Sequence, residues 1–180
     1  TERVALVHNG IIENFGELRD ELKAKGYSFT SQTDSEVCAQ LITHYLRDEK
    51  LPPKDAVRKA LTRMRGAFAF AIIFSGENDL LVAARRGSPL AIGRGDGEMF
   101  VGSDAYALAP FTNRVTYLEE GDYAIITRAG FDIYDEHGRL ANRAETISTA
   151  SENMVDKDGH RHFMAKEIHE QPEVIAHTLS

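Results

Sequence analysis

Residues 67–74, with the sequence AFAFAIIF, constrain the fold more than any other segment of this 180-residue chain. In an extended segment, the phenylalanines and Ile72 share one face, while the alanines and Ile73 share the other. Both faces are therefore apolar, and a strand of this kind has to be covered on both sides. The pattern predicts a layered protein with this segment in its interior.

The residues before this segment predict one strand and three helices. Residues 4–7 are β-branched and aliphatic, which is typical of a buried strand. Asn14 is a suitable N-cap for a first helix, and Glu17 lies at the position that completes a capping box. A second helix is expected to begin at Thr33 or Asp34. A third is expected between the Pro-Pro pair and the glycine that precedes the apolar segment.

The residues after this segment predict a series of short strands. Turns rich in Gly and Asp, of the kind that join hairpins, separate many of them. The segments between them are too short for the helical crossovers of parallel strands, so mainly antiparallel pairing is expected. Helices followed by a strand meander indicate the α+β class. The expected strands are residues 80–84, 90–92, 99–102, 115–118, 123–127 and 131–134.

The charge balance excludes several classes of partner. The chain has 21 basic and 28 acidic residues, a net charge of −7 and no stripe of Lys and Arg. We therefore expect no nucleic-acid partner and no membrane partner. No apolar run approaches the roughly 20 residues that span a bilayer, and a single cysteine excludes an internal disulfide framework. A reducing cytoplasm is the expected location.

The two ends of the chain predict that it is a segment of a longer polypeptide. It opens with TERV, without an initiator methionine or a signal peptide, and almost immediately enters the first expected strand. We therefore expect the N-terminal part of the domain to be missing. From Arg143 the sequence becomes polar and non-periodic. This change predicts a domain over residues 1–142, followed by a polar linker and a helical tail over residues 143–180.

Asn9 and Gly10 permit two interpretations. The simpler is a two-residue turn, because both residues tolerate positive φ and Asn-Gly is a strong hairpin signal. The second is an oxyanion site, because an Asn carboxamide and a Gly N–H are adjacent donors and glycine allows a close approach of substrate. Only Ile11, Ile12 and Glu13 lie between Gly10 and Asn14, the expected N-cap of the helix. They are too few for a good return strand, which weakens the turn interpretation.

Asp34 and Cys38 each have a structural and a functional interpretation. Asp34 can cap the second helix, or it can hold a substrate ammonium at the mouth of a cleft. Cys38 is the only thiol and lies on the apolar side of that helix with no obvious base nearby. A buried structural cysteine is therefore favoured over a nucleophile. The sequence has no pair of cysteines at zinc-binding spacing, and its histidines lack the His-Glu helical spacing of metal-binding helices. We therefore expect no metal site and no cofactor.

Five motifs, read together, resemble the glutaminase domain of one family of class II glutamine amidotransferases, the glutamine–fructose-6-phosphate aminotransferases. They are VHNGIIEN, SQTDSEV, RRGSPL, FVGSDA and LEEGD. The segment HFMAKEIHEQP, residues 162–172, resembles that family's link between its glutaminase and sugar-isomerase domains. The resemblance runs from Val4 to Pro172.

The resemblance implies an N-terminal-nucleophile hydrolase fold, an αββα sandwich of mainly antiparallel sheets. It implies that Asn9 and Gly10 form the oxyanion hole and that Asp34 binds the α-amino group of glutamine. The implied parent enzyme hydrolyses glutamine through a cysteinyl thioester and passes the ammonia to fructose 6-phosphate, giving glucosamine 6-phosphate and glutamate. Residues 1–142 are then a partial glutaminase domain, and residues 143–180 lead to an absent isomerase domain that binds fructose 6-phosphate. The parent is expected to be a homo-oligomer.

The chain departs from this family in its nucleophile. The family attacks glutamine with an N-terminal cysteine, which this chain lacks. Thr1 opens what is expected to be the wrong strand and lies close to Asn9 in the sequence, so we reject it as a substitute. The chain alone is therefore expected to be inactive. Two alternatives stay open: a non-catalytic ligand-binding module of the same fold, and the glutaminase half of another class II amidotransferase.

Overall fold

The computed structural model describes residues 1–149 and 159–179, and within them the strands form two sheets. The larger sheet has six strands: β1 (Val4–Ile12), β2 (Gly66–Phe74), β3 (Leu81–Arg86), β7 (Tyr123–Thr127), β8 (Gly130–Tyr134) and β9 (Leu140–Ala141), in that spatial order. The smaller sheet has four: β10 (Glu145–Ile147), β6 (Arg114–Tyr117), β4 (Ala91–Arg94) and β5 (Met99–Gly102), again in spatial order. All neighbouring strands pair antiparallel.

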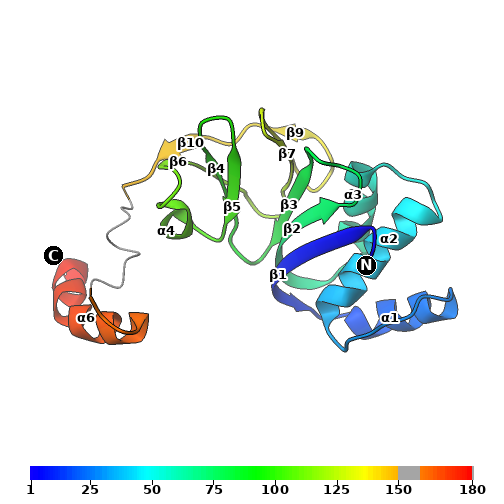
Figure 1. Ribbon diagram of the computed structural model, residues 1–180, viewed down its shortest axis with the longest axis horizontal. Helices are drawn as coiled ribbons and strands as arrows, with labels where there is room; N and C mark the ends of the chain where they lie inside the picture. The colour runs from blue at the N-terminus through cyan, green and yellow to red at the C-terminus, as the bar shows by residue number, and fades with distance from the viewer. Residues whose placement is uncertain (150–158, 180) are drawn as a thin grey trace.

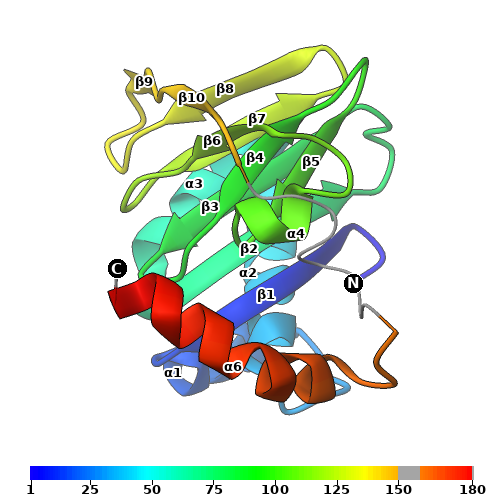
Figure 2. The ribbon, with the colours of Figure 1, turned by 90° about the vertical axis from the view of Figure 1, so that its left-hand side faces the viewer.

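The helices lie outside the two sheets. They are α1 (Phe15–Ala24), α2 (Asp34–Arg47), α3 (Pro53–Arg63), α4 (Ala105–Leu108) and α6 (Phe163–Leu179). Helices α1, α2 and α3 lie on the side of the larger sheet that faces away from the smaller sheet (Figure 1). Figure 2 shows β4, β5 and β6 in front of the larger sheet, with α2 and α3 behind it. The α+β class and the antiparallel pairing expected from the sequence are confirmed.

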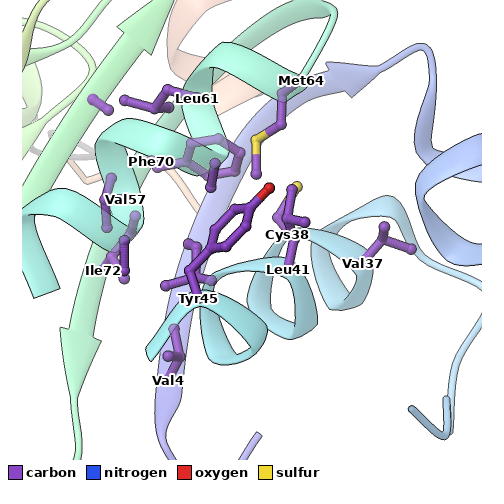
Figure 3. Packing of buried hydrophobic residues seen from close by; sticks show 14 of the residues in the cluster. Val4, Val37, Cys38, Leu41, Tyr45, Val57, Leu61, Met64, Phe70 and Ile72 are labelled. Atoms are coloured by element: carbon purple, nitrogen blue, oxygen red, sulfur yellow. The ribbon is translucent and has the colours of Figure 1, made fainter. Parts of the chain in front are cut away.

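Three apolar clusters hold these layers together. The largest lies between α1–α3 and the larger sheet, where Phe70 and Ile72 of β2 face the helices (Figure 3). A second lies between the two sheets and includes Ala69 from the other face of β2. In the third, Leu108 of α4 packs against Val115 on the outer side of the smaller sheet. The order of layers is therefore αββα, with α4 forming the outer layer on the smaller sheet in the described part of the chain.

Strand β2 is covered completely on only one face. The phenylalanine face is buried against the helices, as expected. On the alanine face, Ala69 is buried, but Ile73 is 53% exposed. Ile73 lines a cleft of about 460 Å³, and Met99 of the smaller sheet lines the same cleft. The two sheets therefore separate at this end of β2. The expectation of cover on both sides is right at Ala69 and wrong toward both ends of the strand, where Ala67 and Ile73 are exposed.

Strand β1 continues through the Asn-Gly pair. It pairs with β2 along its whole length, from Val4 opposite Phe74 to Ile12 opposite Gly66. The turn interpretation of Asn9-Gly10 is therefore wrong. Gly10 has φ +122°, a conformation that glycine adopts without the steric penalty of a side chain. The pairing with β2 keeps the strand extended across a dipeptide that often ends one.

Helices α1 and α2 begin in different ways. The hydroxyl of Thr33 caps α2, so the helix begins at Asp34 as expected, but Asp34 is not the cap. Asn14 precedes α1 without a side-chain capping bond, so the predicted capping box is wrong. Its carboxamide instead donates to the carbonyl of Arg63 and accepts from the backbone N–H of Arg65. Asn14 thus joins the start of α1 to the segment between α3 and β2.

The polar segment from Arg143 begins with residues that pack on the sheets. The Arg143 guanidinium donates to both carboxylate oxygens of buried Asp122, at 2.8 and 2.9 Å. β10 then pairs with β6 at the edge of the smaller sheet. α6 lies apart from both sheets (Figure 1) and continues through Pro172. In residues 1–149 and 159–179, no helix has the length and apolar character needed to cross a membrane.

Candidate active site

A groove of about 140 Å³ lies between the free edges of the two sheets and contains Asn9. β1 forms one edge of the larger sheet, and β5 forms one edge of the smaller sheet. Asn9 is exposed, and its carboxamide has no hydrogen-bond partner among the described residues. The residues that line the groove are Val7, His8, Asn9, Ala69, Phe70, Ala71, Leu90, Val101, Gly102 and Ser103. An amide group is therefore available to a ligand in a partly apolar groove.

Gly10 is required by the geometry of β1 next to this groove. A Cβ atom at this position would lie 2.1 Å from the carbonyl oxygen of Ala67 on β2. Its positive φ is also one that residues with side chains rarely adopt. Glycine therefore allows the two strands to approach closely while its own backbone stays exposed.

Asp34 lies at the start of α2 and is joined to β1. Its Oδ2 accepts a hydrogen bond from the backbone N–H of Ile12 at 2.9 Å, two residues after Gly10. Its Oδ1 accepts from the backbone N–H of Ser35 at 2.8 Å. The side chain is 22% exposed. Each oxygen has one backbone donor and can accept another hydrogen bond, so the carboxylate is fixed in place without being saturated.

Glu36 fixes the loop that leads into α2. Its carboxylate accepts four hydrogen bonds, from the backbone N–H and hydroxyl of both Thr30 and Ser31. Partial burial alone would raise the pKa of Glu36, but these bonds lower it to about 2. The loop and the first turn of α2 therefore hold Asp34 in a defined position.

His8 is a residue of this region that the sequence did not single out. Its Nδ1 lies 3.0 Å from Ser35 Oγ and 3.7 Å from Asp34 Oδ1. Its ring is 4.7 Å from that of Phe70, and its side chain is 2% exposed. Burial lowers the pKa of His8, and the nearby Asp34 carboxylate only partly opposes this effect. In β1, period-2 alternation places His8 and Asn9 on opposite faces, but the sequence predicted a strand only as far as Val7.

The structure thus places all three predicted site residues on or beside β1, but it does not place them in one cavity. Asn9 lines the groove, and Gly10 follows it on β1. Asp34 does not line the groove; it reaches β1 through Ile12 and lies next to His8.

Neither Cys38 nor Thr1 lies at the groove. Cys38 is fully buried beside Tyr45 and Met64 (Figure 3), and burial raises the pKa of its thiol. The prediction of a buried cysteine is confirmed. The Thr1 hydroxyl lies 2.9 Å from that of Thr43, before the start of β1. In the described part of the chain, no three His, Cys, Asp or Glu residues are grouped so that they could hold a metal ion.

Comparison with known proteins places this chain among glutamine amidotransferases. The glutamine amidotransferase domain family matches residues 1–110. The glutamine–fructose-6-phosphate aminotransferase (isomerizing) of Mesorhizobium japonicum is 58% identical over 180 residues, which are 100% of this chain and 30% of that protein. The corresponding protein of Bradyrhizobium diazoefficiens is 55% identical over 100% of this chain and 29% of its own length. The chain thus spans about 30% of these curated relatives.

Two solved structures share the fold. The glutamine phosphoribosylpyrophosphate amidotransferase from B. subtilis, complexed with ADP and GMP, has a TM-score of 0.62 and 30% identity, over 76% of this chain and 30% of that one. A structure described as the allosteric regulatory enzyme of purine biosynthesis has a TM-score of 0.62 and 29% identity, over 74% of this chain and 28% of that one. The predicted α+β fold of the N-terminal-nucleophile hydrolase type is confirmed. The chain belongs to the glutamine amidotransferase domain family.

Proposed function

We propose that the whole protein transfers the amide nitrogen of glutamine to fructose 6-phosphate, giving glucosamine 6-phosphate and glutamate. This chain supplies part of the glutaminase half, and the isomerase half binds the sugar. The support is that aminotransferases of this name are 53–58% identical over the whole chain, whereas the phosphoribosylpyrophosphate amidotransferase is 30% identical over part of it. The expected cytoplasmic location and homo-oligomeric parent belong to the same proposal.

In this proposal, Asn9 and Gly10 stabilise the oxyanion that forms when a thiolate attacks the amide carbon of glutamine. The observation that carries the proposal is the exposed Asn9 carboxamide, which faces a groove without any described hydrogen-bond partner. The N–H of this carboxamide and the backbone N–H of Gly10 are hydrogen-bond donors of the kind that stabilise a developing negative charge. Backbone that is held extended by pairing with β2 keeps these donors ordered before the reaction begins.

Asp34 binds the α-ammonium group of glutamine in the same proposal. Its two oxygens each retain an unused lone pair beside β1, and the side chain is partly exposed. A hydrogen bond between a carboxylate and an ammonium group is about twice as strong as one between neutral groups. Ile12, whose backbone N–H holds Asp34, lies three residues after Asn9, about 10 Å along β1 at the usual rise per residue.

The nucleophile is not among the residues that face the groove. The family uses an N-terminal cysteine, and the only thiol of this chain, Cys38, is buried with a raised pKa. A thiol with a raised pKa supplies little of the reactive thiolate near neutral pH. We therefore expect the 180-residue chain by itself to hydrolyse no glutamine above background.

The test uses the full-length protein and two substitutions. Asn9→Ala is expected to lower the kcat of glutamine hydrolysis by about 10²–10³-fold, because one oxyanion donor is lost. Asp34→Asn keeps an acceptor for the Ile12 N–H and is expected to raise the KM for glutamine by about 10- to 100-fold, because the charge is lost. Asn78→Ala, in the exposed connection between β2 and β3, is the matched control and should leave both constants unchanged.

The outcome also separates the alternatives. Glutamine binding by calorimetry without any turnover in the full-length protein would favour a non-catalytic binding module. Amination of phosphoribosyl pyrophosphate instead of fructose 6-phosphate would favour the other amidotransferase. Full activity of the Asn9→Ala variant would refute the oxyanion role.

A further inference from the structure

His8 links the strand of the proposed oxyanion donors to the helix of the proposed ammonium anchor. It directly precedes Asn9, but its side chain points to the opposite face of β1, toward α2. Besides the hydrogen bond from the Ile12 N–H to Asp34, the polar contacts between this part of β1 and the first turn of α2 are those of His8 Nδ1. These are the 3.0 Å contact with Ser35 Oγ and the 3.7 Å approach to Asp34 Oδ1.

The two ring nitrogens of His8 have different surroundings. Nδ1 faces two oxygens, whereas Nε2 is buried and has no hydrogen-bond partner among the described residues. A proton on Nε2 would therefore have no acceptor, while a proton on Nδ1 points toward Ser35 and Asp34. The low exposure of the ring and its lowered pKa favour the neutral form. The contacts thus favour a neutral imidazole with its proton on Nδ1.

We propose that His8 is a positioning residue for glutamine, which sets the place of Asp34 relative to Asn9 and Gly10 through its Nδ1–H. This inference rests on the proposed function. The backbone N–H of Ile12 holds Oδ2 of Asp34. The contact between His8 and Ser35 fixes the first turn of α2, where the Ser35 N–H holds Oδ1 of the same carboxylate. Without the Nδ1 donor, Asp34 keeps its charge but has one fewer contact with β1. The affinity for the ammonium group then falls, while the oxyanion donors stay in place.

Two substitutions, each of which keeps a nitrogen near one of the two ring positions, separate this role from simple packing. The side-chain amide nitrogen of Asn, like Nδ1, is attached directly to Cγ, whereas that of Gln lies one bond further out, like Nε2. His8→Asn therefore keeps a donor near Ser35, and His8→Gln moves it to the side that has no partner. A residue that acts only by filling space would show the reverse order, because Gln is the larger side chain.

The experiment measures the KM and kcat of glutamine hydrolysis by full-length variants, with thermal unfolding as a control for folding. We expect His8→Gln and His8→Phe to raise the KM for glutamine by about tenfold, with kcat changed less than threefold. His8→Asn should stay within about threefold of the wild-type KM. His137→Asn, in the exposed connection between β8 and β9, is the matched control and should change neither constant. Equal KM values for the Asn and Gln variants, or an unchanged KM in a folded His8→Phe variant, would overturn the inference.

Ser35 provides a second test that does not alter the buried ring. Ser35→Ala should raise the KM for glutamine, as His8→Gln does. Ser35→Thr keeps the hydroxyl and should therefore keep the KM of the wild type. The double variant His8→Phe/Ser35→Ala should show the KM of the single variants and not their product, because both remove one contact. A multiplicative effect would contradict the inference.

The Asp34→Asn variant separates failure of this inference from failure of the proposed function. If Asp34→Asn leaves the KM for glutamine unchanged, the proposed function itself fails. If Asp34→Asn raises the KM but the His8 variants do not follow the expected order, only this inference fails.

Discussion

The two faces of β1 differ in what surrounds them, although they alternate along the same nine residues. Val4 and Ile12 face the helices and are buried, and the His8 ring lies on the same side. Val7 and Ile11 face the other way and are 70% and 67% exposed, as is the Asn9 position between them. One face is thus committed to the core, and the other is available to a ligand. A single strand can therefore contribute to the core on one side and stay open to solvent on the other.

The largest expected effect distinguishes two neighbouring isoleucines. Ile12→Ala should lower the free energy of unfolding by about 2–5 kcal/mol, because it leaves a cavity among fully buried side chains. Ile11→Ala, the matched control on the exposed face, should change it by no more than about 0.5 kcal/mol. Urea unfolding of the 180-residue chain measures both. Similar losses for the two variants would show that the faces of β1 do not differ in this way.

A smaller effect is expected at Gly10. Gly10→Ala should cost at least about 1–3 kcal/mol of unfolding free energy, because the residue has φ +122° and its Cβ would overlap the Ala67 carbonyl. Gly16→Ala in α1 is the matched control: nothing lies within 4 Å of its added Cβ, so alanine should stabilise by about 0.4–1 kcal/mol. Thermal unfolding of both variants gives the comparison. A Gly10→Ala variant as stable as the wild type would mean that β1 does not need glycine at this position.

The smallest effect concerns the loop that supports the helix-facing side of the site. Glu36 has a pKa of about 2 in the folded protein, against an ordinary value of 4.5. Because the folded-state pKa is lower, its contribution to stability is complete above about pH 4.5 and is lost as the pH falls toward 2. The melting temperature of the wild type should therefore exceed that of Glu36→Gln at neutral pH, and the two should converge in acid. Glu17→Gln, which alters an exposed pair with Arg65, is the control and should change the melting temperature little at neutral pH. A constant difference between the wild type and Glu36→Gln down to pH 2 would contradict the prediction.

The pattern of residues predicted the class of fold because burial repeats along each element. The alternation of residues 67–74 indicated an interior strand, and the apolar spacing after Thr33 indicated a helix. The Asn9-Gly10 pair gave a wrong local prediction, because pairing with a strand more than 50 residues away overrides the preference of a dipeptide. Asn14 failed for the same reason, since its carboxamide serves residues that come about 50 positions later.

The site was predictable only in part. Asn9, Gly10 and Asp34 were candidates because of their own chemistry, the resemblance favoured their functional interpretations, and their roles stay predictions. His8 was missed because alternation tells which face a residue occupies but not which helix lies beneath it. The position of Ser35 under His8 depends on how α2 packs on β1, and that packing is a tertiary property that no local pattern contains.

The ion pair between Arg143 and Asp122 has a mechanical consequence. β10 lies at one edge of the smaller sheet and β5 at the other, so about three strand spacings, or roughly 14 Å, separate the departing chain from the groove. A pull on residues beyond β10 would be resisted by β6 and by the buried Asp122 carboxylate. Tension from a neighbouring domain would therefore be borne by β6 and by the start of β7, and β7 is separated from β1 by two strands of the larger sheet.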